Sequence, residues 1–337
     1  MDKKKVIIIA EAGVNHNGSL NLAKKLILAA SKANADYIKF QTYNPEDMVR
    51  RNTSLAKYQK KNLKNKISQY DLLKRYQLKK KYYKILIQFS KQNNIKFLSS
   101  PFDIDSINFL NKLNLDFIKI PSGEIDNFFY LKNIAKLNKK LILSTGMSNI
   151  KEIENAINLL TKFGTKRKNI NLLHCHTDYP SEPQNLNLKA IQTLKKKFKL
   201  NVGYSDHSVG IEAPIIAVSY GSKIIEKHLT LDKSFPGPDH SSSLEPFEFK
   251  KMVTAIRNTE KMLGNGIKKP TNKELKNKPL VRKSIFAKIS IKKGEKFSEK
   301  NLICKRPLIG ISASKWYNLI GKRAKKNFKP DDKITLN

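Results

Sequence analysis

The chain has 337 residues, 39% of them hydrophobic, and its 66 Lys and Arg against 28 Asp and Glu give a formal net charge of +38. This content is enough for the cores of a barrel-sized domain and a smaller one, which excludes a chain that is disordered throughout. The apolar run Val6–Ala10 is too short for a signal or membrane-spanning segment, so we expect a cytoplasmic protein with no membrane partner. Cys175 and Cys304 lack metal-type spacing and do not suggest a disulfide framework.

The positive charge raises the question of a nucleic-acid partner. The lysines are scattered in helix-surface settings such as 74–84 and 195–199, and no zinc finger, RNP-like sequence or basic heptad region accompanies them. We therefore interpret the charge as a solvated surface and expect no nucleic-acid partner.

Eight short apolar segments recur along the chain, and the spacing leaves room for one helix between neighbours, which is typical of parallel βα units. In chain order, the predicted strands are Val6–Gly13, Tyr37–Tyr43, Lys96–Asp103, Phe117–Glu124, Lys140–Ser148, Ile170–Pro180, Asn201–Ser208 and Lys223–Leu231. Amphipathic stretches between them predict helices at Leu20–Ala33, Leu72–Gln92, Ile104–Leu113, Ile150–Phe163, Leu186–Phe198 and Glu212–Tyr220.

This alternation predicts a TIM (β/α)8 barrel rather than an open doubly wound sheet, because no G-x-G-x-x-G follows the first strand. Pro246–Leu263 is expected to be a closing helix. The stretch 264–279 is rich in Gly, Pro, Asn and Lys, so we expect a linker at 265–281, between a barrel over 1–264 and a small domain over 282–337. In the small domain we expect β-like pieces at Ser284–Ile291 and Lys333–Leu336, which flank the segment Glu299–Arg306 and a short helix at Ser314–Ile320.

Nearly every predicted strand begins with apolar residues and ends in polar or ionisable ones. In a TIM barrel these carboxyl ends gather on one face, where the active sites of this fold are built. A purely structural barrel does not need them, so the pattern predicts an enzyme. The residues are Glu11, Lys39, Gln41, Ser99, Ser100, Lys119, Ser122, Glu124, Ser144, Thr145, His174, His176, Thr177, Tyr179, Ser205, Asp206, His207, Glu226, Lys227 and His228.

Lys39 and Lys119 lie inside the apolar runs Tyr-Ile-Lys-Phe and Phe-Ile-Lys-Ile. A buried ammonium is unfavourable unless it meets an anion. Together with the hydroxyls of Ser122, Ser144 and Ser205, the two lysines favour a pocket for a phosphorylated or carboxylated ligand. The alternative is that each lysine extends outward between helices and pairs with a nearby acid.

His207 and His228 end neighbouring predicted strands, so both imidazoles could face one divalent ion. A lone histidine is more often structural, but this pair lies in two polar clusters, which favours a site for Mn²⁺ or Mg²⁺. We interpret His174 as structural and leave the role of His176 open. Glu11 and Glu124 are candidates for general acid–base catalysis or sugar-hydroxyl binding, unless they only balance the charge of the lysines.

These residues lie in ordered motifs that resemble the N-acetylneuraminate (sialic acid) synthase family, which includes legionaminate and pseudaminate synthases. The resemblance covers almost the whole chain, and its last motif lies in what resembles the antifreeze-like (SAF) domain of that family. The motifs are Ala10–Gly18, Lys39–Thr42, Lys119–Glu124, Ser144–Met147, Gly203–His207, Glu226–His228, Pro236–His240 and Lys305–Pro307.

The resemblance implies that the enzyme condenses phosphoenolpyruvate with an open-chain N-acetylmannosamine-type aldehyde and releases phosphate by C–O cleavage, with the metal polarising the aldehyde. It implies that phosphoenolpyruvate is held by Lys39, Lys119, Ser122, Ser144, Thr177 and Ser205, and the metal by His207 and His228. The sugar is expected to contact Glu11, Gln41, Glu124, Tyr179 and Asp239, with Glu124 handling protons. Arg306 of the partner subunit is expected to cap the site in a domain-swapped homodimer.

Two positions depart from the family pattern. His176 stands where many relatives carry a small hydroxyl residue or Asn, which bears on sugar specificity. Leu308 follows Pro307 where relatives often have glycine, which bears on the loop that caps the site.

Three classes of function are therefore compared. The first is the synthase, acting on N-acetylmannosamine or on a 2,4-diacetamido-2,4,6-trideoxyhexose as legionaminate and pseudaminate synthases do. The second is another phosphoenolpyruvate condensation of the kind that sugar-phosphate synthases perform, against which the accessory domain and Arg306 argue. The third is a non-catalytic anion- or nucleic-acid-binding protein, which only the net charge favours.

Overall fold

The structure is a computed structural model that describes residues 5–56, 59–60 and 67–336. It forms two compact units, Met1–Gly264 and Asn265–Asn337, and each is considered by itself. The predicted domain ranges also include 1–4, 57–58, 61–66 and 337, which lie outside the described residues.

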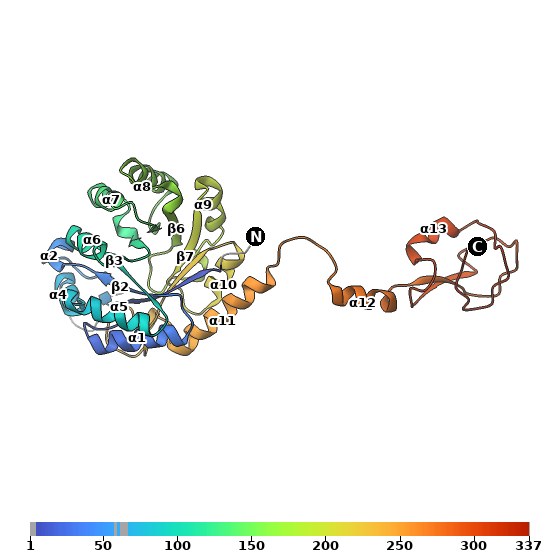
Figure 1. Cartoon of the computed structure of the whole chain (residues 1–337), viewed down its shortest axis with the longest axis horizontal. Helices are drawn as coiled ribbons and strands as arrows, with labels where there is room; N and C mark the ends of the chain where they lie inside the picture. Colours follow the sequence, from blue (N-terminus) through green and yellow to red (C-terminus); the bar gives the residue numbers. More distant parts are fainter. Residues whose placement is uncertain (1–4, 57–58, 61–66, 337) are drawn as a thin grey trace. The chain divides into compact units, whose positions relative to one another are not determined.

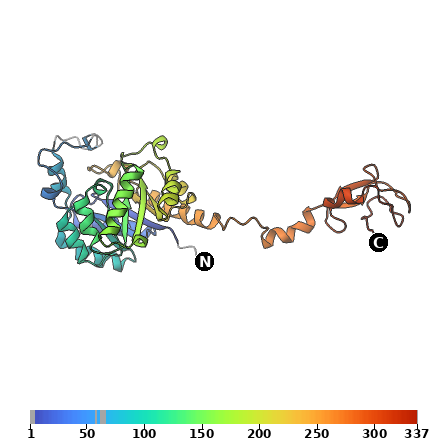
Figure 2. The same cartoon turned by 90° about the horizontal axis from the view of Figure 1, so that it is seen from above.

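The first unit is a (β/α)8 barrel, which confirms the predicted fold class (Figures 1 and 2). Its eight-stranded sheet has the order β3-β2-β1-β8-β7-β6-β5-β4, and each pair of neighbouring strands in this order is parallel. β3 and β4, the two ends of that order, are also neighbours, which closes the sheet. The strands are β1 Ile7–Gly13, β2 Tyr37–Thr42, β3 Lys96–Pro101, β4 Ile118–Ile120, β5 Leu141–Ser144, β6 Ile170–Cys175, β7 Asn201–Asp206 and β8 Ile224–His228.

Helices surround the sheet because a helix that crosses from one strand to the next buries its apolar side against the strands. Figure 1 shows them around the ring of strands. They are α1 Leu20–Lys32, α2 Pro45–Met48, α4 Gln69–Tyr76, α5 Tyr83–Gln92, α6 Ile104–Asn111, α7 Phe128–Ala135, α8 Ile150–Lys162, α9 Ala190–Phe198, α10 Glu212–Ser219 and α11 Pro246–Met262. None of the helices in the described ranges is long and apolar enough to cross a membrane.

The barrel interior is built in layers by the two-residue period of the strands. The lower layer is an apolar cluster of Ile9, Tyr37, Leu98, Ile142, Leu173 and Ile224. Two residues further along the same strands, the inward positions are Glu11, Lys39, Ser100, Ser144, Cys175 and Glu226, and all of them line one cavity. The interior therefore changes from apolar to polar within one step of the pleat.

Several predicted bounds need correction. The predicted helix Leu72–Gln92 is two helices, α4 and α5, because the chain turns to an extended conformation at Gln77, with ψ of 127°. Several predicted strands also run too long at their carboxyl ends, where the polar residues form loops. Pro121 follows β4 directly, and Ser122–Glu124 is a 3₁₀ turn. Helix α7 was not predicted, since its run of Phe-Phe-Tyr resembles a strand and its N-cap, Asn127, is the main helix signal.

The second unit contains an antiparallel pair, β9 Ser284–Ala287 and β10 Leu302–Lys305, around an apolar core that includes Ile285, Phe297 and Phe328. The predicted piece Lys333–Leu336 forms a single bridge, between Lys333 and Phe286, rather than a strand. Helix α13 spans Trp316–Leu319.

The predicted linker contains helix α12, Asn272–Val281, although its content of Gly, Pro, Asn and Lys had indicated irregular chain. A capping box between Thr271 and Glu274 starts this helix and satisfies two backbone N–H groups that would otherwise lack partners.

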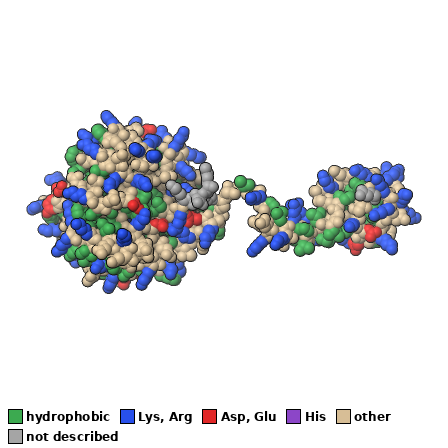
Figure 3. Space-filling view, viewed as in Figure 1, with side chains coloured by type: hydrophobic (Ala, Val, Ile, Leu, Met, Phe, Trp, Pro, Cys, Tyr) green, Lys and Arg blue, Asp and Glu red, His purple; other side chains and the backbone are tan. Residues whose placement is uncertain are grey.

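The positive charge is spread over the barrel. Figure 3 shows Lys and Arg side chains over the whole visible face of the first unit, interspersed with uncharged side chains. This distribution is that of a solvated surface on the visible face, and the predicted lack of a nucleic-acid partner stays a prediction.

Adding a methyl group at Gly203 in β7 tests how closely the barrel interior is packed. A β-carbon at this position would overlap the carbonyl oxygen of Ile224 and come within 2.7 Å of the Leu173 side chain. We expect Gly203→Ala to lower the free energy of unfolding by about 1–3 kcal/mol, because a packed strand leaves no room for a methyl group. Gly123→Ala is the control, since a β-carbon there meets nothing within 4 Å. Urea unfolding measures both, and equal stability of the two variants would contradict the packing.

Candidate active site

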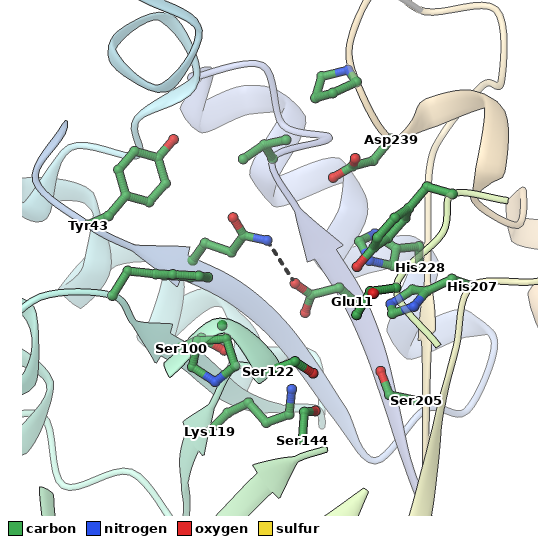
Figure 4. A pocket seen from close by; sticks show the side chains of 18 of the residues that line it. Glu11, Tyr43, Ser100, Lys119, Ser122, Ser144, Ser205, His207, His228 and Asp239 are labelled. Carbon is green, nitrogen blue, oxygen red and sulfur yellow. Dashed lines mark hydrogen bonds between the residues drawn. The ribbon is translucent and has the colours of Figure 1, made fainter. Parts of the chain in front are cut away.

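A cavity of about 400 Å³ opens at the carboxyl ends of the barrel strands (Figure 4). Side chains from all eight strands or their following loops meet there, because the pleat of each strand projects alternate side chains inward. The sequence-predicted residues that line it are Glu11, Lys39, Gln41, Lys119, Ser122, Ser144, Thr177, Tyr179, Ser205, His207, His228 and Asp239.

Two predicted site residues are not among the described residues that line the cavity. Glu124 is half-buried in the 3₁₀ turn after β4, where its carboxylate accepts a hydrogen bond from Asn127 Nδ2 at 2.7 Å. It is not among the described residues that line the cavity, although its neighbours Ser122 and Gly123 are. Arg306 is exposed after β10 in the second unit, so its place at the site stays a prediction.

The floor of the cavity is a buried cluster of two lysines and two glutamates. Lys39 Nζ lies 2.7 Å from Glu11 Oε2 and 3.6 Å from Glu226 Oε2. Lys119 Nζ lies 3.2 Å from Glu226 Oε1, which also accepts a hydrogen bond from Ser205 Oγ at 3.0 Å. Both lysines thus face the barrel interior and not the helices. The acid that balances Lys119 is Glu226, and not Glu124 as one interpretation of the sequence had it.

The pKa values follow from burial and from this shared charge. Burial alone would raise the pKa of Glu226, but the ammonium groups of Lys119 and Lys39 outweigh it and lower that pKa to about 2. Burial lowers the pKa of Lys119 in spite of Glu226. Burial is also the main reason that the pKa of Glu11 rises to about 7, against the opposing effect of Lys39. Glu11 can therefore hold a proton near neutral pH, which leaves an excess of positive charge for an anion to meet.

Hydroxyl groups beside the lysines are available for a ligand. The buried Ser144 hydroxyl has no hydrogen-bond partner among the residues that the structure describes. Ser122 Oγ accepts the backbone N–H of Gly146 at 3.0 Å and lies 3.5 Å from Cys175 Sγ. An unsatisfied buried hydroxyl is unfavourable, so its place on the cavity wall next to an ammonium is suited to an anionic oxygen.

His207 and His228 lie together at the other side of the cavity, with ring centroids 5.4 Å apart. His207 Nδ1 lies 2.5 Å from the carbonyl oxygen of His176, so Nδ1 carries the proton and Nε2 keeps its lone pair. Within the described ranges, the buried His228 Nδ1 has no hydrogen-bond partner. Burial lowers the pKa of His207 to about 4 and that of His228 well below its usual value, so both imidazoles are neutral at pH 7. Tyr179 packs against His207, with the ring centroids 4.1 Å apart and the rings tilted by 36°.

The comparisons with known proteins bear on the whole chain. The NeuB family matches residues 26–268, and the SAF domain matches residues 282–337. This chain belongs to the NeuB family. It is 54% identical over 331 residues, 98% of this chain and 99% of the relative, to N,N'-diacetyllegionaminic acid synthase of Campylobacter jejuni. Its identity to the enzyme of that name from Legionella pneumophila is 44%, over 95% of this chain and 90% of the relative.

A solved structure agrees with this assignment. The N-acetylneuraminic acid synthetase of Leptospira borgpetersenii, crystallised with citrate, superposes with a TM-score of 0.71 at 39% identity, covering 81% of this chain and 90% of that one. The pseudaminic acid synthase of Campylobacter jejuni is 38% identical over 98% of this chain and 96% of its own length. The protein is therefore an enzyme of the transferase class, a condensing synthase of the sialic, legionaminic and pseudaminic acid type.

In this NeuB-family barrel, an ion pair outside the cavity supports the two histidines. Lys227 Nζ, fully buried, contacts the carboxylate of Asp206 and the carbonyl oxygen of Ser208. Asp206 Oδ1 also accepts hydrogen bonds from Tyr204 at 3.0 Å and from the Ser208 backbone at 3.0 Å. Because Asp206 and Lys227 each precede one of the histidines, the pair holds the ends of β7 and β8 together.

Sequence reasoning missed two parts of this site. It placed Glu226, Asp206 and Lys227 in polar clusters but gave them no role, although the signal was there: three ionisable residues in otherwise apolar strands. His174, by contrast, was interpreted as structural, and a ring nitrogen of His174 lies 2.8 Å from the Leu186 carbonyl oxygen, a structural contact. His176 contributes its carbonyl oxygen to His207, and no sequence pattern reveals a backbone contact.

Replacing Glu226 by glutamine tests the buried cluster. The substitution leaves two buried ammonium groups with one carboxylate, so we expect the free energy of unfolding to fall by about 3–5 kcal/mol. Thermal or urea unfolding at pH 7 measures the change. Glu154→Gln is the matched control, because that carboxylate makes exposed pairs with Lys151 and Lys197 and its loss is expected to change stability by less than about 1 kcal/mol. A Glu226→Gln variant as stable as the control would refute the shared-charge description.

Proposed function

We propose that this protein is an N,N'-diacetyllegionaminic acid synthase. It joins phosphoenolpyruvate to an open-chain 2,4-diacetamido-2,4,6-trideoxyhexose and releases inorganic phosphate. The observation that carries the proposal is the identity of 54% and 44% to two enzymes of that name over nearly the whole chain. Identity to the human N-acetylneuraminate-9-phosphate synthase is lower, 33% over 97% of this chain. N-acetylmannosamine, the acceptor expected first from the sequence, becomes the second candidate.

The reaction balances as a carbon–carbon condensation coupled to hydrolysis. C3 of phosphoenolpyruvate forms a bond to the aldehyde carbon of the sugar, and the aldehyde oxygen takes up a proton. Water supplies a hydroxyl to C2, and the bond between C2 and the phosphate oxygen breaks. The products are a nine-carbon keto acid and inorganic phosphate.

The floor of the cavity supports the phosphoenolpyruvate part of the proposal. Lys39 and Lys119 bring two ammonium groups to one place, and Ser144 offers a hydroxyl donor without a partner among the described residues. Charge-assisted hydrogen bonds from such groups hold phosphate and carboxylate oxygens, and they stabilise the charge that develops as phosphate leaves. Ser122, Thr177 and Ser205 line the same cavity and complete this pocket.

Glu11 is the carboxyl group that we assign to proton transfer, in place of Glu124. Glu11 lies on the cavity floor between Lys39 and Gln41, and Gln41 Nε2 donates to Glu11 Oε1 at 3.5 Å. Glu124 lies outside the described lining and is bonded to Asn127. General acid–base catalysis requires hydrogen-bond reach of the reacting atoms, which favours Glu11. Tyr179 and Asp239 line the cavity above it and are proposed to contact the sugar.

The two neutral imidazoles fit a divalent ion. His207 has its Nδ1 occupied by a carbonyl oxygen, and His228 has a buried Nδ1 without a hydrogen-bond partner among the described residues. No group of three or more His, Cys, Asp or Glu in the described ranges is arranged to hold a metal, so substrate or water would supply further ligands. We propose that His207 and His228 hold Mn²⁺ or Mg²⁺, which when bound supplies Lewis-acid polarisation of the aldehyde oxygen.

The function is tested by phosphate release with a panel of acceptors. We expect phosphate only when phosphoenolpyruvate, Mn²⁺ and the diacetamido sugar are all present, with N-acetylmannosamine a poorer acceptor. The assay is run with each component omitted in turn and with chelator as a further control. If no acyl-amino sugar yields phosphate above background at saturating metal, the proposal is wrong.

The metal site is tested with His228→Ala. We expect loss of metal-dependent turnover with the fold retained, because one of two protein ligands is gone. Titration with Mn²⁺ followed by electron paramagnetic resonance measures binding apart from activity, and its affinity is expected to fall roughly 10–100-fold. His174→Ala is the matched control, since that ring bonds to a backbone carbonyl outside the cavity. Unchanged Mn²⁺ binding by His228→Ala would refute the assignment.

We also propose a domain-swapped homodimer in which Arg306 of the partner subunit contacts the sugar. Arg306→Ala is then expected to raise the KM for the sugar roughly tenfold, because a charge-assisted hydrogen bond is lost. Sedimentation is expected to show an unchanged dimer. Lys300→Ala, another exposed cation of the second unit, serves as the control and is expected to leave the KM unchanged. A normal KM in Arg306→Ala, or a monomer in sedimentation of the wild type, would contradict the arrangement.

A further inference from the structure

The cavity has an apolar side opposite the histidines, which the reaction described above does not use. We call it the apolar wall, and it is formed by Val14, Tyr43, Met48, Leu72, Leu73 and Tyr76. All six belong to one hydrophobic cluster, separate from the core beneath the barrel helices. Figure 4 shows Tyr43 across the cavity from His207 and Ser205. The site therefore has one charged region and one apolar region.

Most of the apolar wall is formed by a segment between β2 and β3 that is additional to the (β/α)8 repeat. A βα unit requires one crossover helix between its strands, and between β2 and β3 that helix is α5. Helices α2 and α4 are additional, and they supply Met48, Leu72, Leu73 and Tyr76. Loops at the carboxyl face of a barrel carry specificity, so an added segment that lines the cavity points to a role in substrate binding.

Hydrogen bonds fix the apolar wall in place. Tyr43 Oη donates to the Leu73 carbonyl oxygen at 3.1 Å, and Gln77 Nε2 donates to the Tyr43 carbonyl oxygen at 2.9 Å. Leu73 and Met48 are only partly buried, so their side chains have surface left to cover. A preformed apolar surface of this kind gains affinity by burying methyl groups of a ligand.

A buried carboxylate lies beside the apolar wall. Burial raises the pKa of Asp239 to about 6, so it is mostly ionised at pH 7. Asp239 lines the same cavity as the apolar wall, and Tyr76 Oη donates to the carbonyl oxygen of Pro236, three residues before Asp239 in the chain, at 3.4 Å. A phosphate group at this end of the cavity would meet a like charge, whereas the N–H of an acylamino group could donate to it.

We infer that the apolar wall selects the acceptor sugar by binding the methyl groups at the end of the chain far from the aldehyde. This inference rests on the proposed function, because the aldehyde must lie near His207 and His228 for the condensation. A six-carbon open chain held there extends its distal end toward the opposite side of the cavity. In the 2,4-diacetamido-2,4,6-trideoxyhexose that end carries the C6 methyl and the methyl of the C4 acetamido group. N-acetylmannosamine carries hydroxyls at both positions, and its 6-phosphate carries a dianion.

The size of the effect follows from hydrophobic pockets in general. One methyl or methylene contact distinguishes substrates roughly 10–200-fold in kcat/KM. Replacing one side chain of the apolar wall by a polar side chain of similar size should therefore lower kcat/KM for the diacetamido sugar roughly tenfold. The loss should be in the KM for the sugar, because these contacts exist before and during the reaction. The KM for phosphoenolpyruvate should not change.

The experiment compares Leu73→Gln and Met48→Gln with the wild type on three acceptors. Phosphate release is measured at saturating Mn²⁺ and phosphoenolpyruvate with the diacetamido sugar, N-acetylmannosamine and N-acetylmannosamine 6-phosphate. We expect both variants to lose preference for the diacetamido sugar, so that its kcat/KM relative to N-acetylmannosamine falls roughly tenfold. Leu113→Gln is the matched control, a partly buried leucine packed against the barrel core outside the cavity lining, and its ratio should equal that of the wild type.

The outcomes separate the two ideas. If the wild type prefers N-acetylmannosamine or its 6-phosphate, the proposed function is wrong, and the inference falls with it. If the wild type prefers the diacetamido sugar but both variants keep its ratio, the function stands and the inference is overturned. Thermal unfolding checks that each variant is folded. Should Leu73→Gln fail to fold, Met48→Gln decides alone, because its side chain is a partly exposed end of a four-residue helix.

Discussion

The sharing of one buried carboxylate by two ammonium groups is the interaction on which this site depends. Glu226 lies between Lys39 and Lys119 in the middle of the barrel, at 3.6 Å and 3.2 Å. Each of these side chains would be strongly destabilising alone, because the interior offers no water to solvate it. Together they are tolerated, and their charges balance incompletely whenever Glu11 takes a proton. The remaining positive charge is what makes the cavity suitable for an anionic substrate.

The layers of the barrel explain why the charges are confined to one place. Below the cluster, Ile9, Leu98 and Ile142 belong to an apolar plug that fills the interior of the barrel. Above it, the cavity opens to the loops. The low dielectric of the plug strengthens every charge interaction in the layer above, and the open side admits substrate. The apolar layer thus stabilises the barrel interior, and the polar layer above it forms a site that is open toward the loops at the carboxyl ends of the strands.

The charged floor and the apolar wall of the cavity suit chemically different parts of a ligand. The charged floor, with Lys119 and Ser144, suits the anionic groups of a ligand. The apolar wall is built from α2 and α4, outside the barrel repeat, and can vary without disturbing the strands. The Lys227–Asp206 pair performs a third task, since it fixes the ends of β7 and β8 outside the cavity.

The sequence by itself determined the barrel, the second domain and most of the floor. Period-two alternation, with polar residues ending apolar strands, is a local signal, so Lys39, Ser144 and His228 were placed correctly at the cavity. Glu124 lies one step beyond that signal, in the 3₁₀ turn that follows Pro121, and it is not among the described residues that line the cavity, so its role stays a prediction. Only the tertiary structure decided that Glu226 balances both lysines, that the His176 carbonyl oxygen orients His207, and that an excursion between β2 and β3 forms a wall of the cavity. The reason is that strand spacing fixes which residues point inward, whereas closure of the sheet decides which of them meet.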